Sequence, residues 1–207
     1  MTAPLPSRRG GEATRHRLLR AALELFTSAG FRGTTTPALA ARAGVAEGTI
    51  YRHFDGKEHL LNEVFRGAQR WGMGVVRDQA EQPWPAQERL REIGRRLFDG
   101  AARDPSVVRM LLRGQDRQFL DQRSREVERE FRDALQQVVA GGKSDGMVRA
   151  GPAELWTDVW LALVTFAAER IAAKEWTPDS PPAAMTLDAA WDAIVARAAT
   201  PPSPPGP

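Results

Sequence analysis

The chain has 207 residues, a formal net charge of +3 and no cysteine. This length can bury a sizeable core without covalent cross-links, and the missing thiols exclude disulfides, thiolate-bound metals and cysteine nucleophiles. The three histidines, His16, His53 and His59, lack the paired spacing of a zinc site. We therefore expect no metal and no cofactor.

The positive charge is concentrated at one end of the chain. Residues 1–65 contain nine Lys and Arg against six Asp and Glu, whereas residues 66–207 contain twenty of each. A basic segment on a neutral body is typical of a protein whose one end meets a polyanion while the rest has another task.

No membrane segment is expected. The longest apolar run without a charged residue, Val159 to Ala168, is about half the ~20 residues that a spanning helix requires. The N-terminal arginines are not followed by the apolar stretch of a secretory signal. We expect a cytoplasmic protein with no membrane partner.

The pattern between the chain ends is helical. Residues 1–12 are expected to form a disordered arm and residues 200–207 a disordered tail, because both are poor in packing residues and the tail is rich in proline. No intervening stretch alternates apolar and polar residues as a half-buried strand does. We predict an all-α fold of about nine helices.

The first predicted helix has a clear apolar stripe, and Gly30 ends it. The stripe comprises Leu18, Ala22, Leu25, Phe26 and Ala29. Thr36 as N-cap and Pro37 at the first helical position predict the start of a second helix, which Gly44 terminates.

A short third helix is expected over residues 46–53. Asp55 is predicted to cap a fourth helix over residues 57–79, which is long enough to connect one domain to another. Further helices are indicated by their periodicity and by the proline and glycine breaks between them, near 86–102, 105–113, 122–140, 153–174 and 185–199.

The last two predicted helices have broad apolar faces. Such helices can be covered by pairing with their copies across a two-fold axis, and a monomer with a thick core is the alternative. The candidate dimer-interface residues are Leu163, Ala167, Leu187, Trp191 and Ile194.

The second and third helices, with the glycine turn between them, form a helix-turn-helix pattern. At about 100° per residue, Ile50 and Phe54 point inward together. Four neighbouring residues share the outward arc: Gly48, Thr49, Tyr51 and Arg52.

The chemistry of this arc suits the major groove of DNA. Thr49 or the Tyr51 ring can contact a thymine methyl group, and Arg52 can reach guanine O6 and N7. Gly48 costs a helix about 1 kcal/mol relative to alanine, which favours close approach of another backbone at this position. A frayed helix end with an ordinary surface tyrosine is the alternative.

The sequence FTSAGFRGTTTPALAARAGVAEGTIYRHFDGKEHLL, residues 26–61, closely resembles the DNA-binding domain of the TetR family of transcriptional regulators. The resemblance covers residues 14–65. It implies a helix-turn-helix domain over residues 13–57 and a ligand-binding and dimerisation domain over residues 58–199. It further implies a homodimeric repressor, not an enzyme, that binds a palindromic DNA operator and is released by a small molecule.

The resemblance also assigns roles to residues. Thr36, Tyr51, His53 and Lys57 would contact phosphates, and Gly48, Thr49 and Arg52 would face bases. Pro37 departs from relatives that have a long polar side chain there, so the resemblance does not carry over one base contact from the second helix. Core packing is the alternative role for His53, and a solvated helix start is the alternative for Lys57.

The C-terminal domain is rich in aromatic residues and methionine, which would suit a hydrophobic effector. The candidate pocket residues are Trp71, Phe98, Met110, Leu111, Phe119, Trp156, Trp160 and Phe166. Each of these residues also fits the protein core, and periodicity does not separate the two roles. The alternative function is that of a DNA-binding regulator or activator without a small-molecule effector.

Overall fold

The computed structural model describes residues 8–112 and 117–196. Over these residues the chain is built from helices, and the only β pairing is an isolated bridge between Val148 and Val195. The prediction of an all-α fold is confirmed. The proline-rich tail expected at residues 200–207 and the first seven residues of the expected arm lie outside the described part.

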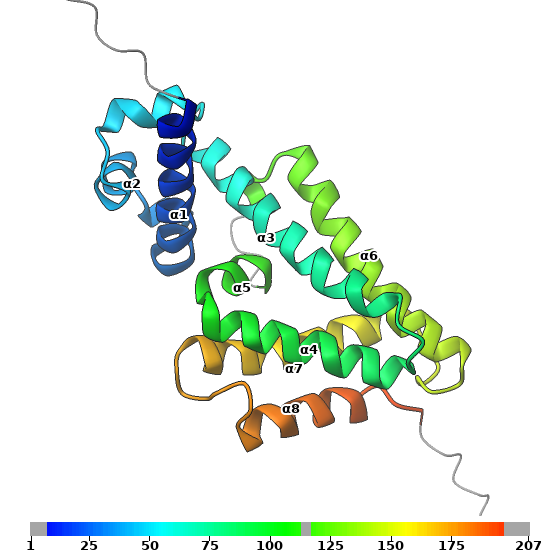
Figure 1. Cartoon of the computed structure of the whole chain (residues 1–207). Coiled ribbons are helices and arrows are strands. Elements are labelled where there is room, and N and C mark those ends of the chain that lie inside the picture. Colours follow the sequence, from blue (N-terminus) through cyan, green and yellow to red (C-terminus); the bar gives the residue numbers. More distant parts are fainter. Residues whose placement is uncertain (1–7, 113–116, 197–207) are drawn as a thin grey trace, which may run out of the picture.

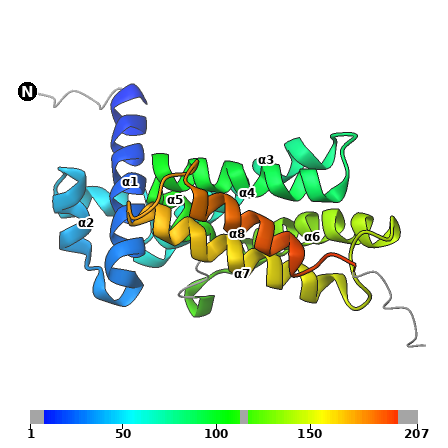
Figure 2. The same cartoon turned by 90° about the horizontal axis from the view of Figure 1, so that it is seen from below.

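The described elements are, in chain order, α1 (Arg8–Gly33), α2 (Thr36–Ala43), the 3-10 helix η1 (Glu47–Arg52), α3 (Lys57–Ala80), α4 (Ala86–Arg103), α5 (Pro105–Leu112), the 3-10 helix η2 (Arg117–Phe119), α6 (Gln122–Ser144), α7 (Ala153–Ala172) and α8 (Pro181–Asp192). Helices α1 and α2 lie at one end of the molecule, and α3 runs from there alongside α6 (Figure 1). Helices α4, α7 and α8 pack on one another, and α7 and α8 form the outer layer seen in Figure 2.

Helix α1 starts earlier than predicted and, as predicted, is interrupted at Gly30. It begins at Arg8, so residues 8–12 are helical, because an adjoining amphipathic helix needs only to propagate and not to nucleate again. The regular helix breaks at Gly30, whose φ of 75° and ψ of 167° are accessible essentially to glycine alone. Its last residues, up to Gly33, form a separate helical turn beyond this kink.

The caps of α2 are partly as predicted. Thr35 and not Thr36 is the N-cap, since the Thr35 side chain accepts a hydrogen bond from the Ala38 N–H at 3.3 Å. Thr36 therefore becomes the first helical residue and Pro37 the second. At the other end Gly44 is confirmed as the helix terminator, with a left-handed φ of 64°.

The prediction that Asp55 caps the next helix is wrong. Gly56 occupies the N-cap position, with a φ of 146°, and α3 begins at Lys57. The Asp55 N–H instead donates to His59 Nδ1 at 3.1 Å, so the local turn is closed by a side chain of the following helix.

Two C-terminal helices have other bounds than predicted. Helix α8 begins at Pro181, because Ser180 and the proline supply a start earlier than residue 185, and it ends at Asp192. Helix α6 continues through the glycine pair at its end to Ser144. A Cβ at Gly142 would lie 2.6 Å from the Ala86 Cβ, so this glycine serves close helix packing and does not break the helix.

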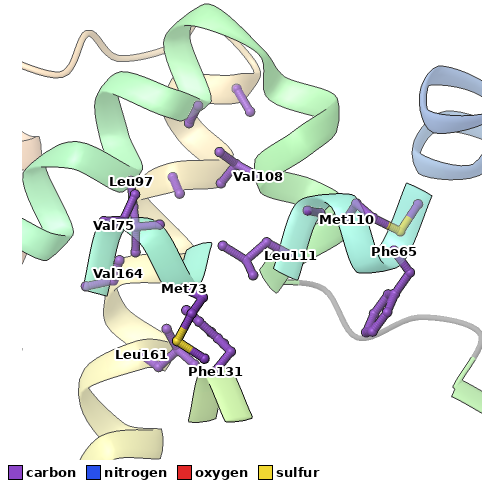
Figure 3. Close-up of a cluster of buried hydrophobic side chains, with 14 of the residues drawn as sticks. Phe65, Met73, Val75, Leu97, Val108, Met110, Leu111, Phe131, Leu161 and Val164 are labelled. Carbon is purple, nitrogen blue, oxygen red and sulfur yellow. The ribbon is translucent and has the colours of Figure 1, made fainter. Parts of the chain in front are cut away.

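Helix α3 contributes to two parts of one apolar core. Its N-terminal turns complete the core under α1, α2 and η1, which includes Leu18, Ala22, Phe26, Leu39, Ile50, Phe54 and Leu60. Farther along, Met73 and Val75 join Leu97, Val108, Leu111, Phe131, Leu161 and Val164 from α4, α5, α6 and α7 (Figure 3). One rigid helix therefore belongs to the DNA-binding unit and to the bundle.

Arg66, a buried arginine of α3, lies between these two parts of the core. Arg66 on α3 is 5% exposed and donates to Glu63 Oε1 at 2.6 Å, to Asp121 Oδ2 at 2.9 Å and to Ser124 Oγ at 3.0 Å. Glu63 also accepts from Arg15 of α1 at 2.6 Å. The cluster Arg15, Glu63, Arg66 and Asp121 thus connects α1, α3 and the start of α6.

The carboxylates of this cluster are held in their charged form. Burial alone would raise the pKa of Glu63, but the hydrogen bonds from Arg66 and Arg15 outweigh it and hold this pKa below its ordinary value. Burial likewise raises the pKa of Asp121. The hydrogen bonds from the Ser124 N–H and hydroxyl and from Arg66 outweigh this effect, so the pKa of Asp121 lies below its ordinary value.

We predict that Glu63→Gln lowers the free energy of unfolding by about 1–3 kcal/mol at pH 7, the value of a hydrogen bond to a charged group. Because the folded pKa of Glu63 is depressed, its contribution is present above the ordinary pKa of about 4.3 and is lost as pH falls through the folded value. Urea titrations should therefore show the difference between wild type and variant shrinking below about pH 4. Glu130→Gln, an exposed site on α6, is the control. Equal stability of Glu63→Gln and wild type across this range would contradict the role of the cluster.

Candidate nucleic-acid interface

The outward face of η1 is fixed by two buried side chains. Ile50 is fully buried and Phe54 nearly so, and both belong to the core shared with α1 and α2. Tyr51, between them in sequence, is 60% exposed. Because the inward residues hold the element, the outward residues are presented on a rigid base.

The 3-10 geometry sharpens the arrangement expected from the sequence. Backbone bonds from the Thr49 N–H to the Ala46 carbonyl and from the His53 N–H to the Ile50 carbonyl, both 2.9 Å, span three residues. With three residues per turn, side chains at i and i+3 eclipse one another. Gly48 therefore shares a column with Tyr51, and Thr49 shares a column with Arg52.

Nothing in the described part of the chain explains the glycine at position 48. A Cβ built on Gly48 would meet no atom within 4 Å, and its φ is not in the left-handed region. Neither packing nor backbone conformation requires glycine here. Arg52, one turn beyond Thr49, is exposed and has no hydrogen bond or ion pair among the described residues.

Lys57 lies at the junction of α1, α2 and α3. Its Nζ donates to the Phe31 and Thr34 carbonyls, both at 2.8 Å, and lies 4.2 Å from the centre of the Phe31 ring. Lys57 therefore holds the chain segment that leads into α2. An ammonium group has three donors, so one N–H remains for an outside acceptor.

His53 and Thr36 flank the outward face of η1. His53 is the C-cap of η1 and is half-buried, with its ring centre 6.4 Å from that of Phe54. Thr36, at the first position of α2, is also half-buried, whereas its neighbour Thr35 is exposed. Thr35 was not among the predicted contacts, because three consecutive threonines give no signal for which one is the cap.

Ion pairs brace α1 against α2. Glu24 accepts from Arg20 Nε and from Arg42 Nε, both at 2.7 Å. Burial raises the pKa of Glu24, but the hydrogen bonds from Arg42 and Arg20 outweigh it and lower the pKa overall. The orientation of the helix-turn-helix on α1 thus rests on apolar packing and on charge.

Comparison with known proteins identifies this architecture. Residues 18–64 match the family model described as bacterial regulatory proteins of the tetR family. The HTH-type transcriptional repressor KstR2 of Rhodococcus jostii is 27% identical over 154 residues, which are 71% of this chain and 74% of the relative. The N-terminal part of this chain is thus similar to the DNA-binding domain of the TetR family.

Two solved structures show the same fold over most of the chain. A TetR family transcription regulator from Marinobacter aquaeolei has a TM-score of 0.78 and 20% identity, with 92% of this chain and all of that chain covered. AibR, in complex with isovaleryl coenzyme A and operator DNA, has a TM-score of 0.69 and 18% identity, with 87% and 97% covered.

The predicted pocket residues lie in different parts of the described structure. Phe98, Met110 and Trp160 are buried in the core. Phe119 stacks near Phe31, with ring centres 4.2 Å apart. Trp156 is half-buried against the core, and Phe166 is exposed on α7. Of the eight residues, Trp71 borders a cavity of about 810 Å³ and Leu111 borders another of about 190 Å³.

The predicted interface residues are mostly interior to one chain. Ala167, Leu187, Trp191 and Ile194 are buried, and Leu163 is half-buried. Other apolar residues of the same two helices are exposed: Leu155, Ala162 and Phe166 on α7, and Met185 and Ala189 on α8. Periodicity located the apolar helices but not the side that each turns outward.

The described part of the chain offers no group of three or more His, Asp or Glu that could hold a metal ion. Among these residues, no helix is both long and apolar enough to cross a membrane.

We predict that Gly48→Ala preserves or raises the free energy of unfolding, since the added methyl meets no atom, and weakens DNA binding by about 1–3 kcal/mol, the value of a lost base contact. Fluorescence anisotropy on a duplex selected by the wild-type protein measures the binding. Gly74→Ala, in an equally open position on α3, is the control and should bind as wild type does. Unchanged affinity of Gly48→Ala would remove this glycine from the interface.

Proposed function

We propose that this DNA-binding regulator is a repressor that binds a two-fold symmetric operator as a homodimer and leaves it when a small hydrophobic molecule occupies the C-terminal domain. The observation that carries the proposal is the outward face of η1 on its buried base of Ile50 and Phe54. It presents an exposed tyrosine and an arginine that has no partner among the described residues.

Base readout is assigned to the two columns of η1. The major groove is wide enough to admit a helix, and a guanidinium can bond guanine O6 and N7 together. Arg52 is the residue for this contact, and Thr49 in the same column reaches a neighbouring base. Gly48 lets the backbone approach the DNA beside Tyr51, whose ring meets a thymine methyl or whose hydroxyl meets a phosphate.

Phosphate contacts are assigned to the residues around η1. Backbone N–H groups at a helix N-terminus favour anions, and Thr36 at the start of α2 offers both its N–H and its hydroxyl. Lys57 contributes its remaining N–H, and His53 contributes its ring at the end of η1. Lys57→Ala should also release the segment that carries Thr36, so this lysine both binds and positions.

Dimerisation is assigned to the outer face of α7 and α8. Leu155, Ala162 and Phe166 recur at i, i+7 and i+11 and lie on one side of α7, and Met185 and Ala189 are one turn apart on α8. An exposed apolar face of this kind is typical of an interaction site. Two copies packed through these helices form a four-helix bundle with two-fold symmetry.

Control by a ligand is supported by two observations. The C-terminal domain borders a cavity of about 810 Å³, within the usual range for small-molecule sites. AibR, which shares the fold, was solved with both isovaleryl coenzyme A and operator DNA. An effector for the present chain is therefore part of the proposal.

We predict that Arg52→Ala weakens binding to the operator by about 1–3 kcal/mol and relaxes the preference at one base pair in each half-site. Tyr51→Phe should instead weaken binding equally on all sequences. DNA selected from a random pool, followed by anisotropy on its point variants, measures both effects. Arg129→Ala, an exposed and unpaired arginine on α6, is the control. Unchanged affinity of Arg52→Ala would contradict its role, and selected DNA without two-fold symmetry would contradict dimeric binding.

A further inference from the structure

A groove runs between the DNA-binding unit and the C-terminal bundle. Its wider part, about 810 Å³, lies between α3, α4 and the start of α5, and its narrower part, about 320 Å³, lies between α1, α3 and α5. The two parts share Gly67, Arg70, Asp104 and Val107. They therefore form one continuous hollow that reaches from the bundle to α1.

The wider part has an open apolar patch among its charged lining residues. Trp71 and Val75 of α3 face Val107 of α5 across it. Cβ atoms built on Gly67 and Gly74 would meet nothing within 4 Å, so these two positions leave room.

Gly100 fixes the position of the tryptophan. A Cβ there would lie 2.5 Å from the Trp71 ring, so the indole rests directly on the α4 backbone. The groove thus has a rigid aromatic wall.

Most charged groups of the groove already have partners. Arg95 pairs with Glu92 and Asp99 at 2.8 and 3.0 Å, and Arg96 pairs with Asp78 at 2.9 Å. In the narrower part, Arg15 pairs with Glu63 at 2.6 Å and Arg20 pairs with Asp104. Asp78, Asp99, Asp104 and Glu63 are the acidic residues of the lining, and each is thus engaged.

Two arginines of the groove are left without a partner in the described part of the chain. Arg70 on α3 and Arg103 at the end of α4 have no hydrogen bond, ion pair or ring contact. Both line the wider part, next to the apolar wall of Trp71 and Val75. Free cations beside an apolar surface match a ligand that has a hydrocarbon portion and an anionic group.

Asp104 offers a further polar atom. Its Oδ1 is buried and has no hydrogen-bond partner, while its other oxygen accepts from Arg20 of α1. The hydrogen bond to Asp104 also raises the pKa of Arg20 above its ordinary value. A buried carboxylate oxygen without a hydrogen-bond donor lowers stability. A ligand hydroxyl or amide N–H that donates to this oxygen would remove that cost.

We propose that this groove is the effector site of the release mechanism proposed above and that it takes an amphiphilic anion. The hydrocarbon portion lies along Trp71 and Val75, and a carboxylate or phosphate binds Arg70 and Arg103. Operator release by the ligand rests on the proposed function, whereas ligand binding in the groove does not.

The position of the groove gives the ligand a direct route to the DNA-binding unit. The contacts Arg20 to Asp104 and Arg15 to Glu63 span its narrower part and hold α1 to the bundle. An occupant that bonds Asp104 or displaces Leu19 changes these contacts and thereby the placement of α1 and η1.

The test is calorimetric titration of the full chain, without DNA, with dodecanoate, dodecanoyl coenzyme A and the neutral dodecanol. We expect at least one anion to bind and dodecanol to bind at least about tenfold more weakly, the value of one charge-assisted hydrogen bond. The two anions distinguish a carboxylate from a phosphate as the bound group.

Variants locate the site. Arg70→Gln with Arg103→Gln should weaken anion binding by about tenfold or more, and Gly74→Leu should block the apolar part while remaining a good helix former. Arg129→Gln is the matched control and should bind as wild type does. Arg70 and Arg103 are exposed, so their replacement should leave the fold intact. Thermal unfolding of the variants and of wild type checks this.

Three results would overturn the site: no binding of either anion, equal binding of dodecanol, or wild-type affinity of both groove variants. Anion binding that fails to release the operator would retain the site and contradict the release mechanism. Release of the operator by an anion whose affinity the groove variants do not change would retain the mechanism and contradict the site.

Discussion

The structure depends on the buried guanidinium of Arg66. A charge in this position is tolerated only when its donors are satisfied, and the partners come from Glu63 on the same helix and from Asp121 and Ser124 at the start of α6. These bonds fix the start of α6 against α3. Because Glu63 also accepts from Arg15, the same buried charge determines how α1 is held.

The two units of the molecule are connected in different ways. Helix α3 belongs to both parts of the single apolar core, so its two ends are held by packing as one body. Helix α1 reaches the bundle through polar side chains, chiefly Arg15 to Glu63 and Arg20 to Asp104. Polar contacts can be exchanged for contacts with a ligand at little net cost, whereas a packed core cannot be rearranged so readily. In the proposed mechanism, a ligand would therefore act through the α1 contacts, with α3 as the rigid reference.

Local patterns in the sequence were sufficient for much of the DNA-binding unit. Gly44 terminates α2 because a left-handed residue is needed there, and Ile50 and Phe54 point inward because their spacing places them together. The type of η1 could not be predicted, because six residues are too few to separate a period of 3.0 from one of 3.6. The contacts of Lys57 with the Phe31 and Thr34 carbonyls join positions more than twenty residues apart, and no local pattern encodes them.

The C-terminal domain was less predictable for a related reason. Periodicity shows that Phe98, Trp160 and Leu187 face inward, but not which neighbouring element covers them, so core, pocket and interface give the same pattern. The groove depends instead on Gly67 and Gly74, which leave space open because they have no side chain. Its two free arginines could be recognised only after the partners of the other arginines were known.

The central claim is that a ligand in the groove changes the placement of the η1 helices in the dimer. The chain has no cysteine, so Glu47→Cys gives one spin label per chain on an exposed position of η1, and pulsed electron resonance measures the distance between the two copies. With operator bound, the account predicts one narrow distance compatible with half-sites about 34 Å apart. Saturating dodecanoyl coenzyme A or dodecanoate should shift that distance in the free dimer, but not in the same protein carrying Gly74→Leu. An identical distance distribution with and without the bound anion would contradict the account.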